Sequence, residues 1–217
     1  MAAGRSRNGW RRCIRLDEDA VGQLACLVFS VVLPGTIPFV ESPPITLVEA
    51  AVLVPVFRRE DGALRILLVR RSEHGVHGGQ LGFPGGKREP ADHSLLDTAL
   101  REAAEEIGVP REAVEILQAL PGVETLTTGY RISPFLARIV PPRTWQNVSE
   151  EIAEVIEVAA QDLARPEVHG EDMDDLPTWR GSRPQPFFKI GPHRLWGATY
   201  QILRPLLPRL IAGEFRV

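Results

Sequence analysis

A glycine-rich segment followed by an acidic helix decides the fold expected for this chain. The segment reads GFPGGKREPADHSLLDTALREAAEEIG and covers residues 82–108. Its second half predicts a helix, because apolar residues recur there at helical spacing. These residues are Leu96, Ala99, Leu100, Ala103 and Ile107. Asp92 or Ser94 is placed to cap the helix, and Gly108 is placed to end it.

Apolar runs on both sides of this segment predict strands. Before the glycines they cover residues 46–57 and 64–69, joined by a turn at 60–62. After the helix they cover residues 115–120, 131–139, 154–158 and 187–190. Residues 196–212 predict a closing helix interrupted by Pro205 and Pro208. Turn formers predict a loop without regular structure over 75–86, and an acidic solvated loop is expected over 171–175. The alternation predicts one α/β domain with a mixed sheet over residues 46–217.

The composition excludes several classes of protein. The chain has 217 residues, 44% of them hydrophobic, which is enough for a packed core and excludes a disordered or fibrous chain. The net charge of −3 leaves no basic excess to neutralise phosphates, so we expect no nucleic-acid or membrane partner. Two cysteines exclude a disulfide scaffold and a cysteine-built zinc site. We therefore expect a cytoplasmic protein in a reducing compartment.

Residues 1–45 differ from the rest and are interpreted as an N-terminal extension and linker. Residues 1–16 are basic, and residues 20–40 carry no charge but include glycines and prolines. A membrane helix needs about 20 mainly apolar residues, and this stretch reaches that length only with those glycines and prolines included. A membrane segment or an export signal remains an alternative for it.

Three glutamates crowd one end of the predicted helix. Glu102 and Glu106 share a face, and Glu105 lies beside them. Like charges at this spacing cost a helix roughly 0.2–0.5 kcal/mol per pair, so the cluster is either a solvated face or a binding site. Glycines just before the helix allow close approach of a ligand, and Arg101 can orient a glutamate. Hard carboxylate oxygens suit Mg²⁺ or Mn²⁺ acting with substrate phosphates.

The spacing of these residues resembles the Nudix box, although with two departures. Gly86, Asp92 and the run Arg101-Glu102-Ala103-Ala104-Glu105-Glu106-Ile107-Gly108 follow that pattern. Asp92 replaces a glutamate, and one extra residue follows it. Both departures are also typical of the coenzyme A diphosphatase branch of this family.

An upstream motif and three later stretches resemble the same branch. The upstream motif covers residues 67–72 and 79–86, with His77 matching between them, whereas Gly75 stands where the branch has arginine. The later stretches are residues 129–135, 151–155 and 196–199. The resemblance therefore covers about residues 46–213.

The resemblance implies a Nudix-type α/β/α sandwich with a mixed sheet and a set of site residues. The implied metal ligands for Mg²⁺ or Mn²⁺ are Glu102, Glu105 and Glu106. Glu102, Arg101 and Glu151 are the expected catalytic residues. The family does not fix the position of the general base, and Glu151 is the candidate because it lies just before a predicted strand and could reach across to the helix. The expected substrate-binding residues are Arg70, Arg71, His77, Gln80, Gly85 and Gly86. A solvated surface role is the alternative for Glu151 and for the arginines.

The activity implied is hydrolysis of a diphosphate by water attacking phosphorus. The expected substrate is coenzyme A or a derivative, cleaved to 3′,5′-ADP and 4′-phosphopantetheine. Another nucleoside diphosphate derivative, such as ADP-ribose, NADH or a dinucleotide, is the alternative. A third hypothesis is a non-catalytic nucleotide-binding module. The three intact glutamates argue against it, because a binding module has no need for clustered acidic residues that repel one another. The partner expected is a small nucleotide, and a homodimer is left open.

Overall fold

A mixed sheet carries the residues on which the site is built. The computed structural model describes residues 47–73, 78–125, 128–145, 149–174 and 181–217. Within them one sheet has the order β3-β2-β1-β7-β5, with β4 beside β1, β6 beside β7 and β8 beside β2. Its strands are β1 Val48–Arg58, β2 Leu64–Arg71, β3 Leu81–Gly82, β4 Gly85–Lys87, β5 Val114–Ala119, β6 Val123–Thr125, β7 Tyr130–Ile139 and β8 Ile152–Ala159. β1 runs parallel to β7 and antiparallel to β2, so the sheet is mixed as predicted.

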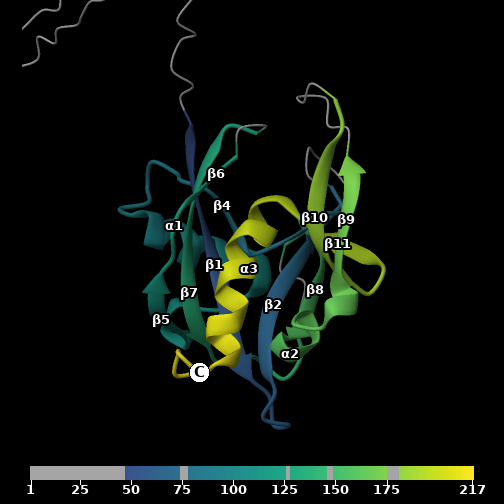
Figure 1. The fold of residues 1–217 in the computed structure, drawn as a ribbon. Helices are drawn as coiled ribbons and strands as arrows, with labels where there is room; N and C mark the ends of the chain where they lie inside the picture. The colour runs from purple at the N-terminus through teal and green to yellow at the C-terminus, as the bar shows by residue number, and fades with distance from the viewer. Residues whose placement is uncertain (1–46, 74–77, 126–127, 146–148, 175–180) are drawn as a thin grey trace, which may run out of the picture. The chain divides into compact units, whose positions relative to one another are not determined.

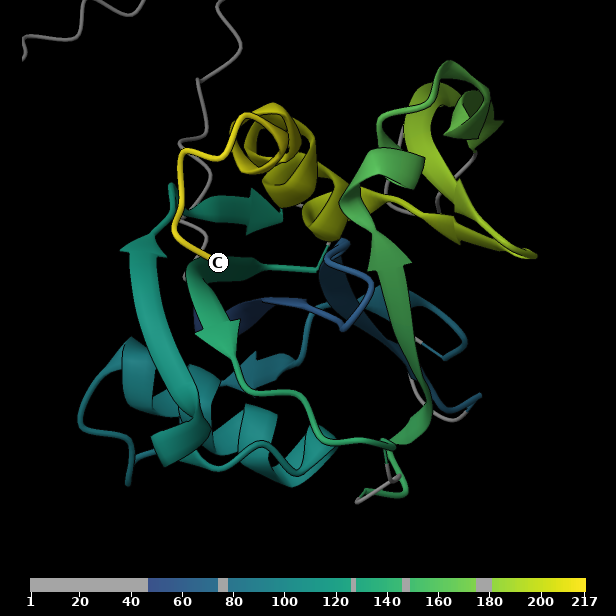
Figure 2. The ribbon, with the colours of Figure 1, turned by 90° about the horizontal axis from the view of Figure 1, so that it is seen from below.

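Helices cover both faces of this sheet. α1, Leu95–Ile107, packs on one face, and α3, Gly197–Ile211, packs on the other (Figures 1 and 2). A second sheet, β11-β10-β9, lies beside α3 and consists of β9 His169–Asp174, β10 Arg183–Ile190 and β11 His193–Leu195. Short α2, Ala160–Leu163, follows β8, and 3₁₀ turns span Arg111–Ala113 and Pro166–Val168. The predicted α/β/α sandwich is confirmed.

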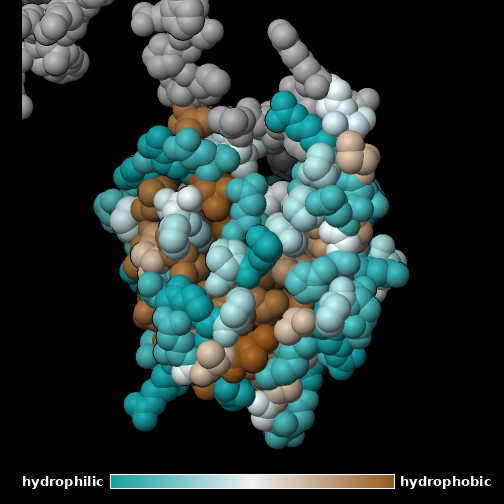
Figure 3. Space-filling model, viewed as in Figure 1, coloured by the Kyte–Doolittle hydropathy of each residue, from teal (hydrophilic) through white to brown (hydrophobic). Residues whose placement is uncertain are grey.

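Alternating residues of the central strands divide the core in two. On β1, Leu53 and Phe57 pack with α1, whereas Val54 and Val56 pack with α3. This period of two is what a strand buried on both faces requires. On the outer side, the face seen in Figure 3 mixes apolar and polar residues along α3.

Two short strands correct the prediction of an irregular loop over 75–86. β4 pairs with the first half of β1, and β3 pairs with the last residues of β2. β1 and β2 pair with each other only at their other ends, through Val56–Arg58 and Leu64–Ile66. The glycine-rich segment therefore fills the space between two diverging strands. It forms short strands there because its backbone pairs with the N–H and C=O groups that β1 and β2 do not use with each other.

Two further predictions near the C-terminus are wrong. Glu171–Asp174 belong to β9 rather than to a loop, because their backbone pairs with β10. The side chains of Glu171, Asp172 and Met173 are exposed, and charged side chains are typical of an edge strand. α3 is also continuous through Pro205 and Pro208, with Leu203, Leu206, Leu207 and Leu210 buried. Apolar packing on both sides of the prolines compensates for the hydrogen bonds they remove.

The N-terminal interpretation concerns residues outside the described part of the chain. The extension over 1–45, and its membrane or export alternative, stay predictions. Among the residues described, no helix is long and apolar enough to span a membrane.

Candidate active site

Helix α1 presents the predicted acidic residues. Of the two candidate caps, Ser94 is the N-cap, and its hydroxyl accepts a hydrogen bond from the Asp97 N–H at 3.1 Å. Gly108 ends the helix in the left-handed conformation, with φ 67°. The apolar face of α1 lies on the sheet, and Glu106 of the same helix is buried as well.

Asp92 anchors Arg101 instead of capping the helix. Its buried carboxylate accepts hydrogen bonds from Arg101 Nε and Nη2, both at 3.1 Å. The Thr98 hydroxyl and the Glu89 N–H also donate to it, each at 2.9 Å. The Arg101 guanidinium holds the pKa of Asp92 well below its usual range. The sequence did not indicate this pair, because Asp92 precedes the helix and lies nine positions before Arg101.

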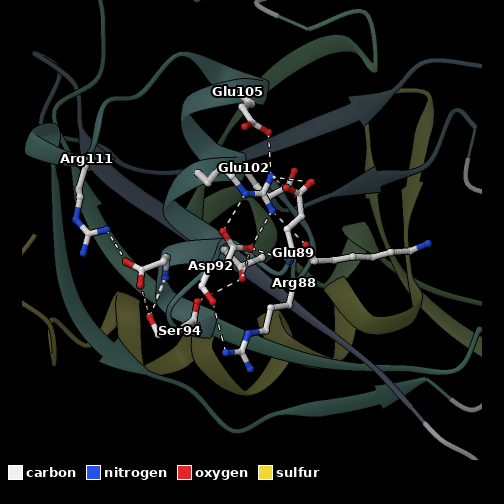
Figure 4. Close-up of polar contacts among 11 residues, drawn as sticks. Arg88, Glu89, Asp92, Ser94, Glu102, Glu105 and Arg111 are labelled. Atoms are coloured by element: carbon white, nitrogen blue, oxygen red, sulfur yellow. Dashed lines mark hydrogen bonds and ion pairs between the residues drawn. The ribbon is translucent and has the colours of Figure 1, made fainter.

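Arg101 in turn holds two of the predicted metal ligands. Its Nη1 lies 3.0 Å from Glu102 Oε1 and 3.0 Å from Glu105 Oε2. Figure 4 shows Asp92, Glu102 and Glu105 around this one guanidinium. These contacts are consistent with the prediction that Arg101 orients a glutamate. The hydrogen bonds to Asp92 in turn hold the guanidinium of Arg101 in place.

The glycines of β4 allow the carboxylates to lie against the backbone. The Gly85 N–H donates to Glu106 Oε2 at 2.9 Å. A side chain at Gly85 would meet the Ala51 carbonyl oxygen at 2.4 Å, so β4 could not approach β1 with any larger residue. A Cβ at Gly86 would lie 2.3 Å from Glu102 Oε1. The carboxylate of Glu102 therefore occupies the space that a side chain at Gly86 would take.

Burial sets the electrostatics of these two glutamates. Only 2% of Glu106 is exposed, and burial raises the pKa of its carboxyl to about 7. Burial also raises the pKa of Glu102, against the opposing effect of Arg101. A buried carboxylate is costly without a cation beside it, so the pair favours a positively charged ligand.

The two predicted substrate arginines contact different partners. Arg71 Nη2 donates to the Gly85 carbonyl at 2.9 Å and lies 3.4 Å from Glu106 Oε1. Arg70 instead pairs with Glu73 at 3.0 Å and Glu154 at 3.4 Å. The pairing register of β2 with β8 shifts between these two arginines, and such an irregularity redirects side chains.

Glu151 lies at the edge of the same group. Its Oε2 is 3.9 Å from Arg71 Nη1, and three quarters of its side chain is exposed. The Glu151 carbonyl accepts a hydrogen bond from the Ser72 N–H at 2.8 Å, which ties its backbone to the end of β2. Arg71 therefore connects the candidate base with the buried Glu106.

The remaining predicted residues are only partly described. Gln80 is half-buried, and its carbonyl accepts a hydrogen bond from the Arg71 N–H at 3.0 Å. His77 lies outside the described residues. The backbone carbonyl of Lys87 accepts a hydrogen bond from Arg101 at 3.2 Å.

The donor set fits a hard divalent cation. Glu102 and Glu106 offer only oxygen, and beside the β4 glycines Glu106 is buried and Glu102 is half-buried. In the described part of the chain, no three acidic, histidine or cysteine side chains are already gathered around one point. Mg²⁺ does not need three, because it usually takes one or two carboxylates together with water and substrate phosphates. Glu105 is more exposed and is turned toward Arg101.

Comparison with known proteins identifies the family of this chain. Residues 47–179 match the model of a family described as NUDIX domain. NudL, an uncharacterized Nudix hydrolase of Salmonella paratyphi B, is 38% identical over 161 residues, which are 73% of this chain and 80% of NudL. This chain belongs to the Nudix hydrolase family. The NudL of Salmonella newport matches with the same figures. A MutT/nudix family protein from Enterococcus faecalis has a TM-score of 0.52 and 19% identity, covering 82% of this chain and 65% of its own, and supports the fold alone.

Membership of the Nudix family establishes the general chemistry. The protein is a hydrolase of phosphoric anhydride bonds, and its substrate is a nucleoside diphosphate derivative. Nudix hydrolases generally need divalent cations such as Mg²⁺ or Mn²⁺.

Proposed function

We propose that this Nudix hydrolase cleaves the diphosphate of coenzyme A or its derivatives, giving 3′,5′-ADP and 4′-phosphopantetheine. The proposal is carried by the upstream motif, which lies against the acidic end of α1. The Arg71 N–H donates to the Gln80 carbonyl, and the Arg71 guanidinium donates to the Gly85 carbonyl. Gly85 then contacts Glu106. The residues that resemble the coenzyme A branch thus border the Nudix glutamates.

Glu102 and Glu106 are the proposed principal metal ligands, with Glu105 joining them. When bound, a divalent cation neutralises charge on the diphosphate oxygens and lowers the pKa of a coordinated water. Arg101 keeps Glu102 in place, and Asp92 keeps Arg101 in place. The backbone N–H of Gly85 holds one oxygen of Glu106, leaving its other oxygen directed toward Arg71.

Glu151 is the proposed general base. Its exposed carboxylate is free to accept a proton from the attacking water, and the contact of its backbone with Ser72 keeps it at the site's edge. The proton would pass to Glu151 as the water oxygen bonds to phosphorus and the bridging oxygen leaves with the other phosphate.

The arginines of β2 are the proposed contacts of the substrate's phosphates. Guanidinium groups bind phosphate oxygens through charge-assisted hydrogen bonds. Arg71 is closest to the carboxylates, whereas Arg70, Gln80 and His77 are proposed to bind parts of the substrate farther from the scissile bond. The presence of Gly75 in place of the branch's arginine is the observation that favours the alternative, another nucleoside diphosphate such as ADP-ribose or NADH.

A substrate screen tests the proposal. The full chain is incubated with coenzyme A, ADP-ribose, NADH and 8-oxo-dGTP, in Mg²⁺ and in Mn²⁺, with Glu106→Gln as the inactive control. We expect preferential cleavage of coenzyme A, with both products identified by mass, and its loss in the variant. Preferential cleavage of ADP-ribose or NADH would replace the coenzyme A assignment. Binding without cleavage by the folded protein would instead support a nucleotide-binding module.

A further inference from the structure

The predicted metal ligands and the candidate base all lie beside arginines. Arg101 lies beside Glu102 and Glu105, and Arg71 lies beside Glu106 and Glu151. In this structure, two guanidinium groups therefore compensate the negative charge of the site's carboxylates. A divalent cation at these carboxylates would be repelled by whichever guanidinium stayed in contact with them.

The two arginines are held very differently. Arg101 makes paired hydrogen bonds to buried Asp92, whose position is fixed by Thr98 and by the Glu89 N–H. Arg71 has one short side-chain hydrogen bond, to the Gly85 carbonyl at 2.9 Å. Its two carboxylate contacts are longer, 3.4 Å to Glu106 and 3.9 Å to Glu151. A third of the Arg71 side chain is exposed, so its guanidinium is the one with room to move.

The backbone of Arg71 is nevertheless fixed. Its N–H donates to the Gln80 carbonyl at 3.0 Å, and its carbonyl accepts a hydrogen bond from the Gly79 N–H at 3.1 Å. The end of β2 is therefore clamped by the β3 segment while the guanidinium extends from it. A rotation of the side chain would carry the charge away from Glu106 without disturbing the sheet.

We propose that Arg71 is a resident counter-cation of the metal site, which metal binding releases from Glu106 toward the phosphates of the substrate. The inference rests on the metal-dependent function proposed above and adds a second role, that of counter-cation to the metal ligands, to one proposed substrate contact. The positive charge of Arg71 beside Glu106 weakens metal binding. Once the metal has replaced the guanidinium at Glu106, Arg71 strengthens substrate binding. The substrate class is any diphosphate, so the inference does not depend on coenzyme A.

The direct test measures Mn²⁺ binding to the full chain in the absence of substrate. Arg71→Gln removes the charge but keeps a donor for the Gly85 carbonyl, and we expect it to bind Mn²⁺ about tenfold more tightly than wild type. Arg71→Lys, which keeps the charge, should bind within about threefold of wild type. The matched control is Arg70→Gln, an adjacent arginine paired with Glu73 and Glu154, and its Mn²⁺ affinity should not change.

The second arm measures the Michaelis constant for the substrate at saturating Mn²⁺. We expect Arg71→Gln to raise the Michaelis constant about tenfold or more. The variant would then bind the substrate more weakly although it binds Mn²⁺ more tightly. A residue with a merely structural role would weaken both. Unchanged or weaker Mn²⁺ binding by Arg71→Gln overturns the inference and leaves the proposed hydrolysis intact. Failure of the wild type to bind Mn²⁺ would instead overturn the proposed metal site.

A measurement on the unmodified protein covers the case in which Arg71→Gln does not fold. Guanidinium ¹⁵N signals are followed during a Mg²⁺ titration, with Arg71 assigned from its loss in Arg71→Lys. We expect the Arg71 signal to shift as the metal binds, while the Arg70 signal stays in place. An Arg71 signal that does not move at saturating Mg²⁺ contradicts the proposed release.

Discussion

At the scale of single residues, Asp92 has the carboxylate that is held by the most hydrogen bonds in the described part of the site. Its carboxylate is buried and accepts four hydrogen bonds, two of them from Arg101. Removing one charge of a buried ion pair is costly, because the other charge stays behind unpaired. Asp92 therefore supports both the stability of the fold and the orientation of Glu102.

We predict that Asp92→Asn lowers the free energy of unfolding by about 3 kcal/mol at pH 7. The pKa of Asp92 is lowered in the folded protein, so its contribution is present above the ordinary aspartate pKa and is lost as the pH falls further. Urea denaturation of both proteins should show a constant difference between pH 5 and 8 and a shrinking one below about pH 4. A difference that stayed the same in acid would show that the ion pair is not its source.

The second prediction at this scale concerns Glu106 and the metal. A ligand that binds only the folded state at 100 times its dissociation constant stabilises by about 2.7 kcal/mol. For a domain of this size that corresponds to roughly 5–10 °C in melting temperature. We expect Mn²⁺ to raise the melting temperature of the wild type by this amount, and EDTA to reverse the change. Glu106→Gln should lose the response, whereas Glu154→Gln, a glutamate of β8 paired with Arg70, should keep it.

At the scale of elements, the closeness of β4 to α1 determines the geometry of the carboxylates. Gly86→Ala places a methyl group 2.3 Å from Glu102 Oε1, and the side chain of Glu102 must move to make room. Because a glutamate end is flexible, we predict a change in unfolding free energy within about 1 kcal/mol. The turnover rate should fall by about 10²-fold, since Glu102 leaves its place.

Gly82→Ala on β3 is the matched control for this prediction. Its methyl group would meet only the Thr199 hydroxyl, at an ordinary contact distance of 3.8 Å. Rates and melting temperatures of the two variants are measured side by side. Equal activity in both would mean that the contact between β4 and Glu102 does not matter for the reaction.

At the scale of the whole molecule, the central sheet separates two hydrophobic clusters. Leu100 of α1 belongs to one, and Leu203 of α3 belongs to the other. Truncation of a buried leucine to alanine costs about 2–5 kcal/mol. We predict that Leu100→Ala and Leu203→Ala each fall in this range and add within about 0.5 kcal/mol in the double variant. Urea denaturation measures the sum, and a larger discrepancy would mean that the sheet couples its two faces.

The sequence by itself determined most of the longer helices and strands and, through the resemblance to the Nudix box, the general chemistry of the protein. Periodicity alone located α1 and the strands β1, β2, β5, β7 and β8 to within a few residues, since amphipathic spacing and turn residues are local signals. The glutamates of α1 and the glycines before it resemble the Nudix box, which implied a hydrolase, and that activity is confirmed by the family. Local signals also led to three errors, the irregular loop over 75–86, the acidic loop over 171–175 and the interrupted helix α3.

Only the tertiary structure decided what each charged residue contacts. β3 and β4 are strands because β1 and β2 diverge and offer them hydrogen bonds, which no local pattern encodes. The pairing of Asp92 with Arg101, and of Arg71 with Glu106, joins residues nine and 35 positions apart through the packing of β4 on α1. The same packing buries Glu106 and raises its pKa, because desolvation depends on neighbours brought from other parts of the chain.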